Sequence, residues 1–251
     1  MSGEIAPLAL AWCALALACG GLIKGALGVG TPLLTVPLMA LVLPPQTAVM
    51  VMALPVVAAN LWQAARAPRV DHVVARFWPT FAAILVGTWI GIGILARIDE
   101  RALLIVVGVA VIGFAALQGS NRQLRIPARM EKVAGAGFGF ASGVIGGISS
   151  FFGPMLIAYL VALQTLGKDQ FVGAISFLYI GAVLPWAIAL YLTGLLDHRL
   201  LALSALAVAP VALGMALGRR LRRRISERRF ERLIVTVLIG SGCVILWRAL
   251  G

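Results

Sequence analysis

The chain has 251 residues, of which 61% are hydrophobic and only 12% are charged, which is far more apolar than a soluble domain with a wetted surface. Lysine and arginine (21) outnumber aspartate and glutamate (9), giving a net charge of +12. The basic residues concentrate in short loops between apolar segments, and no aromatic residues alternate with them to stack on bases. Composition and charge therefore argue against a soluble domain and a nucleic-acid partner, and they predict an all-α integral membrane protein surrounded by lipid.

Ten apolar segments follow one another along the chain, without any polar stretch long enough to fold as a separate domain. We therefore expect one membrane domain. The first segment has no basic region before it and no small-residue cleavage site after it, so we expect a membrane span and not a signal peptide. The second and seventh segments, of about 13 to 15 residues, reach about 20 Å against a hydrocarbon core of about 30 Å and cannot cross as straight helices. The segments lie near residues 7–27, 31–43, 46–65, 74–96, 102–118, 133–148, 153–167, 170–192, 198–218 and 230–249.

The two halves of the chain resemble each other. Residues 21–41 and 143–163 share eight identities in 21 positions at an offset of 122, and the later motif RIDER recurs as RISER. We therefore predict a duplicated unit of five segments. Repeat 1 covers about 7–118, a cytoplasmic linker covers 119–132, and repeat 2 covers about 133–249.

An odd number of crossings in each unit predicts that the second copy is inverted in the membrane relative to the first. The loops near 66–71, 119–132 and 219–232 are basic, whereas those near 44–46, 97–101 and 193–199 are short and nearly neutral. Because basic loops stay in the cytoplasm, we expect both termini outside, at the periplasmic face of a bacterial-type inner membrane.

Each half has a short, glycine-interrupted segment at the same place, which is typical of a secondary transporter. Backbone can leave a helix inside the bilayer only where protein or a water-filled cavity satisfies its amide groups. We therefore expect helix breaks at residues 25–31 and 147–153, each lining a cavity.

A new helix should begin after each break. Thr31 before Pro32, and Gly153 before Pro154, predict an N-cap residue followed by proline at the first helical position. Helix N-termini present free N–H groups and partial positive charge, so two of them meeting near the midplane would bind an anion. Two glycines of the first break, Gly28 and Gly30, belong to this predicted site.

Lys24 stands in the apolar sequence just before the first break. A lysine in hydrocarbon costs at least about 2.5 to 3.5 kcal/mol unless it reaches an interface or meets a partner. All nine acidic residues lie in loops or at segment ends, so a bound anion is one candidate counter-ion. The alternative is that Lys24 lies near the cytoplasmic end of its segment and extends to the interface. Gly146 holds the equivalent place in repeat 2, so the site would be asymmetric.

Four further polar residues are weaker candidates. The hydroxyls of Ser149 and Ser150 could bind an oxyanion, but they are equally able to bond a carbonyl of their own helix. Asn60 and Gln63 could line the cavity, although hydrogen bonding between helices is the favoured interpretation.

The sequence offers little to an enzyme. The repeated Asp-His pairs at 71–72 and 197–198 are better explained by helix capping than by proton relay. Three cysteines lie in apolar segments without metal-ligand spacing (Cys13, Cys19 and Cys243). We therefore expect no enzymatic activity, no cofactor and no metal.

Two stretches resemble the glycine-proline signatures of the TauE/SafE family of membrane transporters. They are GLIKGALGVGTPLLTVPLMALVLPPQTAV, followed by LPVVAANL, and GVIGGISSFFGPMLIAYLVALQTLGKDQF. The resemblance covers essentially the whole chain and implies an inverted repeat of helices with the site between the halves. The breaks read GVGTP and SSFFGP, where relatives often carry denser glycine runs.

The resemblance implies movement of sulfite or organosulfonates, so sulfite export is the first functional hypothesis. Uptake of an organosulfonate or another small organic anion is the second. A third, from a different class, is a membrane scaffold whose basic loop at 219–232 docks a protein or anionic lipid. The sequence leaves the direction, the coupling ion and the oligomeric state open.

Overall fold

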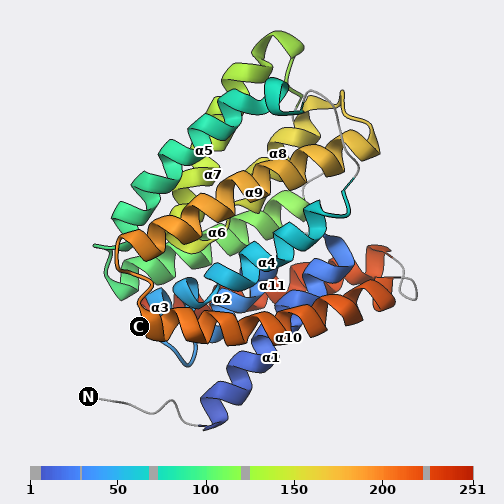
Figure 1. The fold of residues 1–251 in the computed structure, drawn as a ribbon. Helices are drawn as coiled ribbons and strands as arrows, with labels where there is room; N and C mark the ends of the chain where they lie inside the picture. Colours follow the sequence, from blue (N-terminus) through green and yellow to red (C-terminus); the bar gives the residue numbers. More distant parts are fainter. Residues whose placement is uncertain (1–6, 29, 68–72, 120–124, 223–226, 251) are drawn as a thin grey trace. The chain divides into compact units, whose positions relative to one another are not determined.

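The computed structural model describes residues 7–28, 30–67, 73–119, 125–222 and 227–250, and within them the chain is helical, as predicted, without strands. The first Asp-His pair, at 71–72, and parts of the basic loops at 66–71, 119–132 and 219–232 lie outside the described residues. The helices are α1 (Pro7–Leu27), α2 (Thr31–Met39), α3 (Pro45–Val51), α4 (Ala53–Ala64), α5 (Val73–Leu95), α6 (Glu100–Gly119), a 3-10 turn (Ala128–Met130), α7 (Glu131–Ser149), α8 (Gly153–Leu163), α9 (Lys168–Leu192), α10 (His198–Arg222) and α11 (Glu227–Leu250) (Figure 1).

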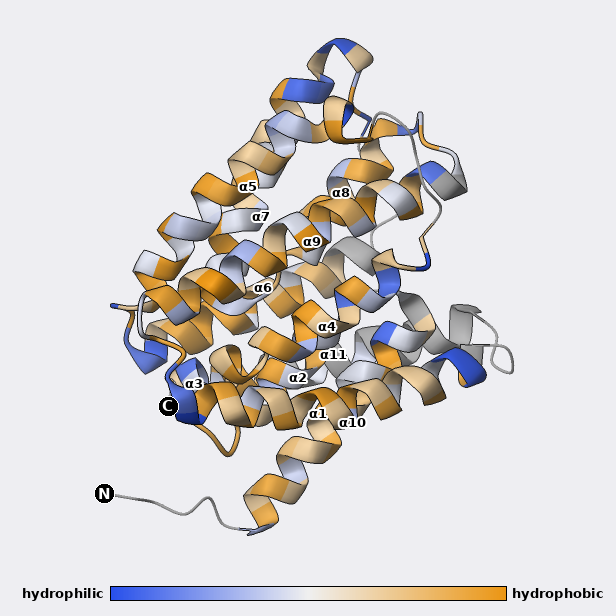
Figure 2. Ribbon diagram, in the orientation of Figure 1, coloured by the Kyte–Doolittle hydropathy of each residue, from blue (hydrophilic) through white to orange (hydrophobic). Residues whose placement is uncertain are grey.

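The helices follow the predicted segments closely. Apolar residues run along most of them, and hydrophilic residues gather toward helix ends and loops (Figure 2). Helices α2 and α8, with 9 and 11 residues, extend only about 14 and 17 Å, too short to cross a bilayer. Within the described residues, five stretches are long and apolar enough to cross: Pro7–Ala26, Pro45–Ala64, Val73–Leu95, Gln170–Leu192 and His198–Leu221.

The third predicted segment is interrupted, because α3 ends at Val51 and α4 begins at Ala53. Pro55 has no N–H to donate to the Val51 carbonyl four residues earlier. The Ser204 hydroxyl of α10 donates to that carbonyl at 2.9 Å and accepts the Leu54 N–H at 2.9 Å. A serine from another helix thus satisfies the backbone groups at the interruption, as the interior of a membrane protein requires.

The helices divide into two compact units, and each unit takes helices from both halves of the chain. The first contains α1, α2, α3, α6, α10 and α11; the second contains most of α4 with α5, α7, α8 and α9. Helix α1 packs along α10 in the first unit, and α5 packs along α7 in the second (Figure 1).

Glycines bring the backbones of α1 and α10 into close contact. A Cβ on Gly21 would overlap the backbone of Val211, and one on Gly25 would overlap that of Met215. From the opposite side, a Cβ on Gly214 would overlap the Ala18 carbonyl. Small residues four apart on each helix form this interface, as is common between membrane helices.

The α5–α7 pair has the same construction. A Cβ on Gly143 would overlap the backbone of Ile84, one on Gly147 would meet the Thr88 carbonyl, and one on Gly87 would overlap the Phe140 carbonyl.

These two interfaces match residue by residue. The α7 positions lie 122 residues after those of α1, and the α10 positions lie 127 residues after those of α5. The first segment of each half therefore packs against the fourth segment of the other half. The inverted orientation of the copies in the membrane stays a prediction.

Candidate functional site

The first break separates α1 from α2. Helix α1 continues to Leu27, so the break is shorter than the predicted 25–31 and comprises residues 28–30, of which Val29 lies outside the described residues. The N–H of Gly28 donates to the Lys24 carbonyl at 2.7 Å, with Gly28 in the left-handed conformation (φ +82°). This is a glycine C-cap, which ends a helix without a Cβ penalty.

The start of α2 differs from the predicted N-cap by one residue. Gly30, at φ +98°, is the N-cap, so Thr31 is the first helical residue and Pro32 the second. A glycine N-cap has no side chain, and the Thr31 hydroxyl therefore does not cap the helix. That hydroxyl is buried, with Thr31 only 1% exposed, and it has no hydrogen-bond partner among the described residues.

The opposite end of α2 is well satisfied. The Trp12 indole N–H donates to the Leu38 carbonyl at 2.7 Å, and the Arg248 guanidinium donates to the carbonyl of Ala40. One turn after Thr31, the Thr35 hydroxyl donates to the Ala16 carbonyl of α1 at 3.3 Å. The negative end of the α2 dipole thus meets a cation, and its positive end begins beside a buried hydroxyl.

Lys24 lies one turn before the end of α1 and is 3% exposed, so protein atoms cover its side chain. Its carbonyl is the one that accepts the Gly28 N–H. Four predicted site residues of the first unit therefore lie within one short stretch of chain, from the last turn of α1 to the start of α2: Lys24, Gly28, Gly30 and Thr31.

The second break separates α7 from α8 and repeats the first turn. Helix α7 continues to Ser149, and the N–H of Ser150 donates to the Gly146 carbonyl at 2.7 Å, with Ser150 at φ +66°. Ser150 and Gly146 lie 122 residues after Gly28 and Lys24. The break comprises residues 150–152 instead of the predicted 147–153.

Aromatic side chains fill this second break. A Cβ on Gly146 would overlap the ring of Phe152, which lies 5.9 Å from the Trp186 ring, centroid to centroid. The Trp186 N–H donates to the Gly147 carbonyl at 3.2 Å. Phe152 is also the N-cap of α8, so Gly153, predicted as the N-cap, is instead the first helical residue.

The hydroxyls of Ser149, the last residue of α7, and of Ser150, the first residue of the break, donate to nearby backbone carbonyls. Ser149 donates to the Ile145 carbonyl at 2.6 Å, and Ser150 donates to the Ser149 carbonyl at 2.5 Å. This is the arrangement that the sequence offered as the alternative to oxyanion binding.

The remaining candidates lie on α4. The Asn60 amide donates to the Val56 carbonyl of the same helix at 2.7 Å, and its residue is buried. Gln63 is half-buried. Asn60, Gln63, Ser149, Ser150 and Gly153 thus belong to the second unit, whereas Lys24 and Thr31 belong to the first.

Two kinds of polar feature escaped the sequence analysis. Besides Thr31, the hydroxyls of Thr88 and Ser176 are buried without a hydrogen-bond partner in the described part of the chain. Periodicity carries no signal for an unsatisfied hydroxyl.

Among the described residues, no group of three or more histidine, cysteine, aspartate or glutamate side chains could hold a metal.

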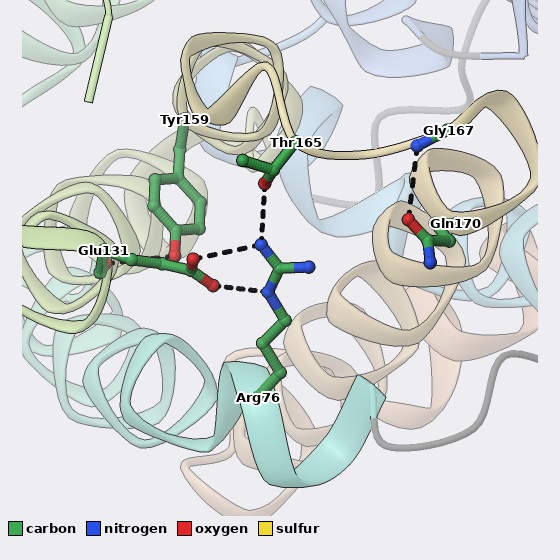
Figure 3. Close-up of polar contacts among 6 residues, drawn as sticks. All are labelled: Arg76, Glu131, Tyr159, Thr165, Gly167 and Gln170. Carbon is green, nitrogen blue, oxygen red and sulfur yellow. Dashed lines mark hydrogen bonds and ion pairs between the residues drawn. The ribbon is translucent and has the colours of Figure 1, made fainter. Parts of the chain in front are cut away.

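The second feature is an ion pair between Arg76 of α5 and Glu131 of α7 (Figure 3). The Arg76 Nη2 atom lies 3.0 Å from Glu131 Oε2 and also donates to the Thr165 hydroxyl at 2.8 Å. The Tyr159 hydroxyl donates to the Glu131 backbone carbonyl at 3.1 Å. The contacts join the starts of α5 and α7 to α8 and the residues after it.

A family model described as "Sulfite exporter TauE/SafE" matches residues 13–245 of the chain. No curated protein and no solved structure matches the chain.

Proposed function

The chain belongs to the TauE/SafE family of sulfite exporters, and we propose that it is a secondary transporter that exports small sulfur oxyanions or organosulfonates, sulfite foremost, across a bacterial-type inner membrane. In this proposal both termini face the periplasm. The anion binds between the two inverted repeats, where a helix begins after a break.

The observation that carries the proposal is the start of α2. The first N–H groups of a helix lack partners within that helix, and together they favour negative charge. Beside them lies the buried Thr31 hydroxyl, which has no partner among the described residues. Lys24, one turn before the break, adds positive charge on the preceding helix. An anion accepts hydrogen bonds from all three kinds of group.

Membrane potential can supply the driving force. An anion that leaves a cell with a negative interior gains about 2.3 kcal/mol per charge per 100 mV, so export needs no coupling ion. The acidic residues lie outside the ten apolar segments or at their ends, which favours this mechanism over a carboxylate proton relay. Protonation of the substrate or of Lys24 is the alternative route to coupling.

The test is sulfite efflux from proteoliposomes under an imposed potential. We expect flux that rises with the potential in the wild type and falls at least about 10-fold in Lys24→Ala, with Lys24→Arg retaining more because it keeps the charge. Protein-free liposomes and equal reconstitution of each variant are the controls. Absence of flux with sulfite and with a panel of sulfonates would contradict the proposal, and net uptake against the potential would favour import.

A further inference from the structure

The two helix breaks share a backbone turn but have opposite surroundings. Gly28 and Gly30 are half-buried, and among the described residues a Cβ on Gly28 would meet no atom within 4 Å other than those of its chain neighbours. In the second break, residues 150–153 are all buried. The described residues therefore leave space beside Gly28 in the first break, whereas protein encloses the second break.

A pair of residues has been exchanged between the copies. Repeat 1 has a large residue on the helix, Lys24, and a glycine at the N-cap, Gly30. Repeat 2 has a glycine on the helix, Gly146, and a large residue at the N-cap, Phe152, and the Phe152 ring covers Gly146. The cationic side chain of one copy is thus replaced by an aromatic ring in the other.

The helix start in the second copy is occupied as well. A Cβ on Gly153 would overlap the hydroxyl of Tyr179, so the ring of Tyr179 reaches the first residue of α8. The Ser142 hydroxyl donates to the Phe152 carbonyl at 2.7 Å, which fixes the turn that carries the ring. These contacts close the second break from within its own unit.

We propose that the two breaks have diverged in role, so that the α1–α2 break alone holds the anion and the α7–α8 break is a closed structural copy. The inference rests on the proposed function. The Cα–Cβ bonds of a helix tilt toward its N-terminus, so the Thr31 side chain projects back toward the break and the N–H groups there. The Thr31 side chain supplies the hydroxyl donor for the anion. At the equivalent position of repeat 2, aromatic side chains cover the start of α8.

Kinetics of sulfite transport by purified, reconstituted protein separate the two breaks. Thr31→Val removes the unpartnered hydroxyl with little change of shape, and Thr31→Ser keeps it. We expect KM for sulfite to rise about 10- to 100-fold in Thr31→Val, because a hydrogen bond to a charged ligand is lost, and to remain near the wild-type value in Thr31→Ser. Ser149→Ala and Ser176→Ala probe the hydroxyls of the second unit and should change KM by less than about twofold.

Thr35→Val is the matched control, since it makes the same change one turn later on the same helix. Its hydroxyl bonds the Ala16 carbonyl, so this variant should lose thermal stability and keep its KM. Thr31→Val should retain or gain stability in the absence of sulfite, because a buried hydroxyl without a partner is removed. If Thr31→Val does not fold, Thr31→Ala replaces it.

An unchanged KM in Thr31→Val, or a rise in Ser149→Ala or Ser176→Ala equal to that of Thr31→Val, overturns the inference while wild-type flux upholds the proposed function. Absence of flux in the wild type with sulfite and sulfonates overturns both.

Discussion

Arg76 and Glu131 form a bidentate ion pair that ties the first turn of α5 to the first residue of α7 (Figure 3). The two side chains are 33% and 15% exposed, and the Arg76 guanidinium also lies 5.3 Å from the Phe77 ring. The pair therefore holds the polar end of the helix pair whose interior is packed by glycines.

The Arg76–Glu131 pair should contribute measurably to the stability of the second unit. In a double-mutant cycle of Arg76→Met and Glu131→Gln, we expect a coupling free energy of about 1 kcal/mol, because water partly screens both groups. The measurement is thermal unfolding in detergent. Coupling should fall as salt is raised, and coupling that is zero at low salt would contradict the expectation.

Ser204 should matter because Pro55 cannot donate a hydrogen bond. Ser204→Ala leaves the Val51 carbonyl and the Leu54 N–H unsatisfied, so we expect a loss of about 1 to 3 kcal/mol in unfolding free energy. In a Pro55→Ala background the restored N–H can bond Val51, and the same serine substitution should cost less. Equal costs in both backgrounds would rule out this explanation.

The α5–α7 interface can be tested with two glycines on one helix. A Cβ on Gly91 would contact Val144 and Gly147, whereas one on Gly93 would meet no other part of the described chain within 4 Å. Gly91→Ala should destabilise the protein by about 1 to 3 kcal/mol through overpacking. Gly93→Ala should be neutral or stabilise it by up to about 1 kcal/mol, since alanine favours a helix over glycine. Thermal unfolding of both variants decides the matter, and equal shifts would count against close helix contact.

The two helix breaks should respond alike to a Cβ, because Gly28 and Ser150 share the left-handed conformation. We expect glycine to be more stable than alanine at each position by about 1 kcal/mol. Unfolding of Gly28→Ala against wild type, and of Ser150→Gly against Ser150→Ala, gives the two differences. A preference for alanine at either position would show that the turns are not equivalent.

Much of the fold follows from apolar runs and punctuation. The bounds of α1, α5 and α9 were predicted within two residues, because long membrane helices are defined by uninterrupted hydropathy. The break at Met52 was missed, although Pro55 was a signal, because a proline inside a membrane helix is often accommodated without interruption. The helix exchange was not predicted, since a duplication does not specify which copies pair.

The candidate site was predicted only in part. Glycine and proline located both turns, but each N-cap was assigned one residue too late. In isolation Thr31 is a better capping residue than Gly30, and Gly153 is a better one than Phe152. The closure of the second break by Phe152 depends on the space over Gly146, which is a tertiary property. Sequence comparison of the halves could have indicated it, since the large residue and the glycine change places.

The exchange of helices between the halves also fixes an order of assembly during synthesis. The glycine face of α1 packs against α10, which begins only at His198. At a synthesis rate of roughly 5 to 20 residues per second, α1 therefore remains without that partner for about 10 to 35 seconds. The helices of the second unit are complete once Leu192 has been made. All helices of the second unit have therefore been synthesised while the first unit, which contains the N-terminal helix, still lacks α10 and α11. Neither half of the chain expressed alone contains all the helices of either unit.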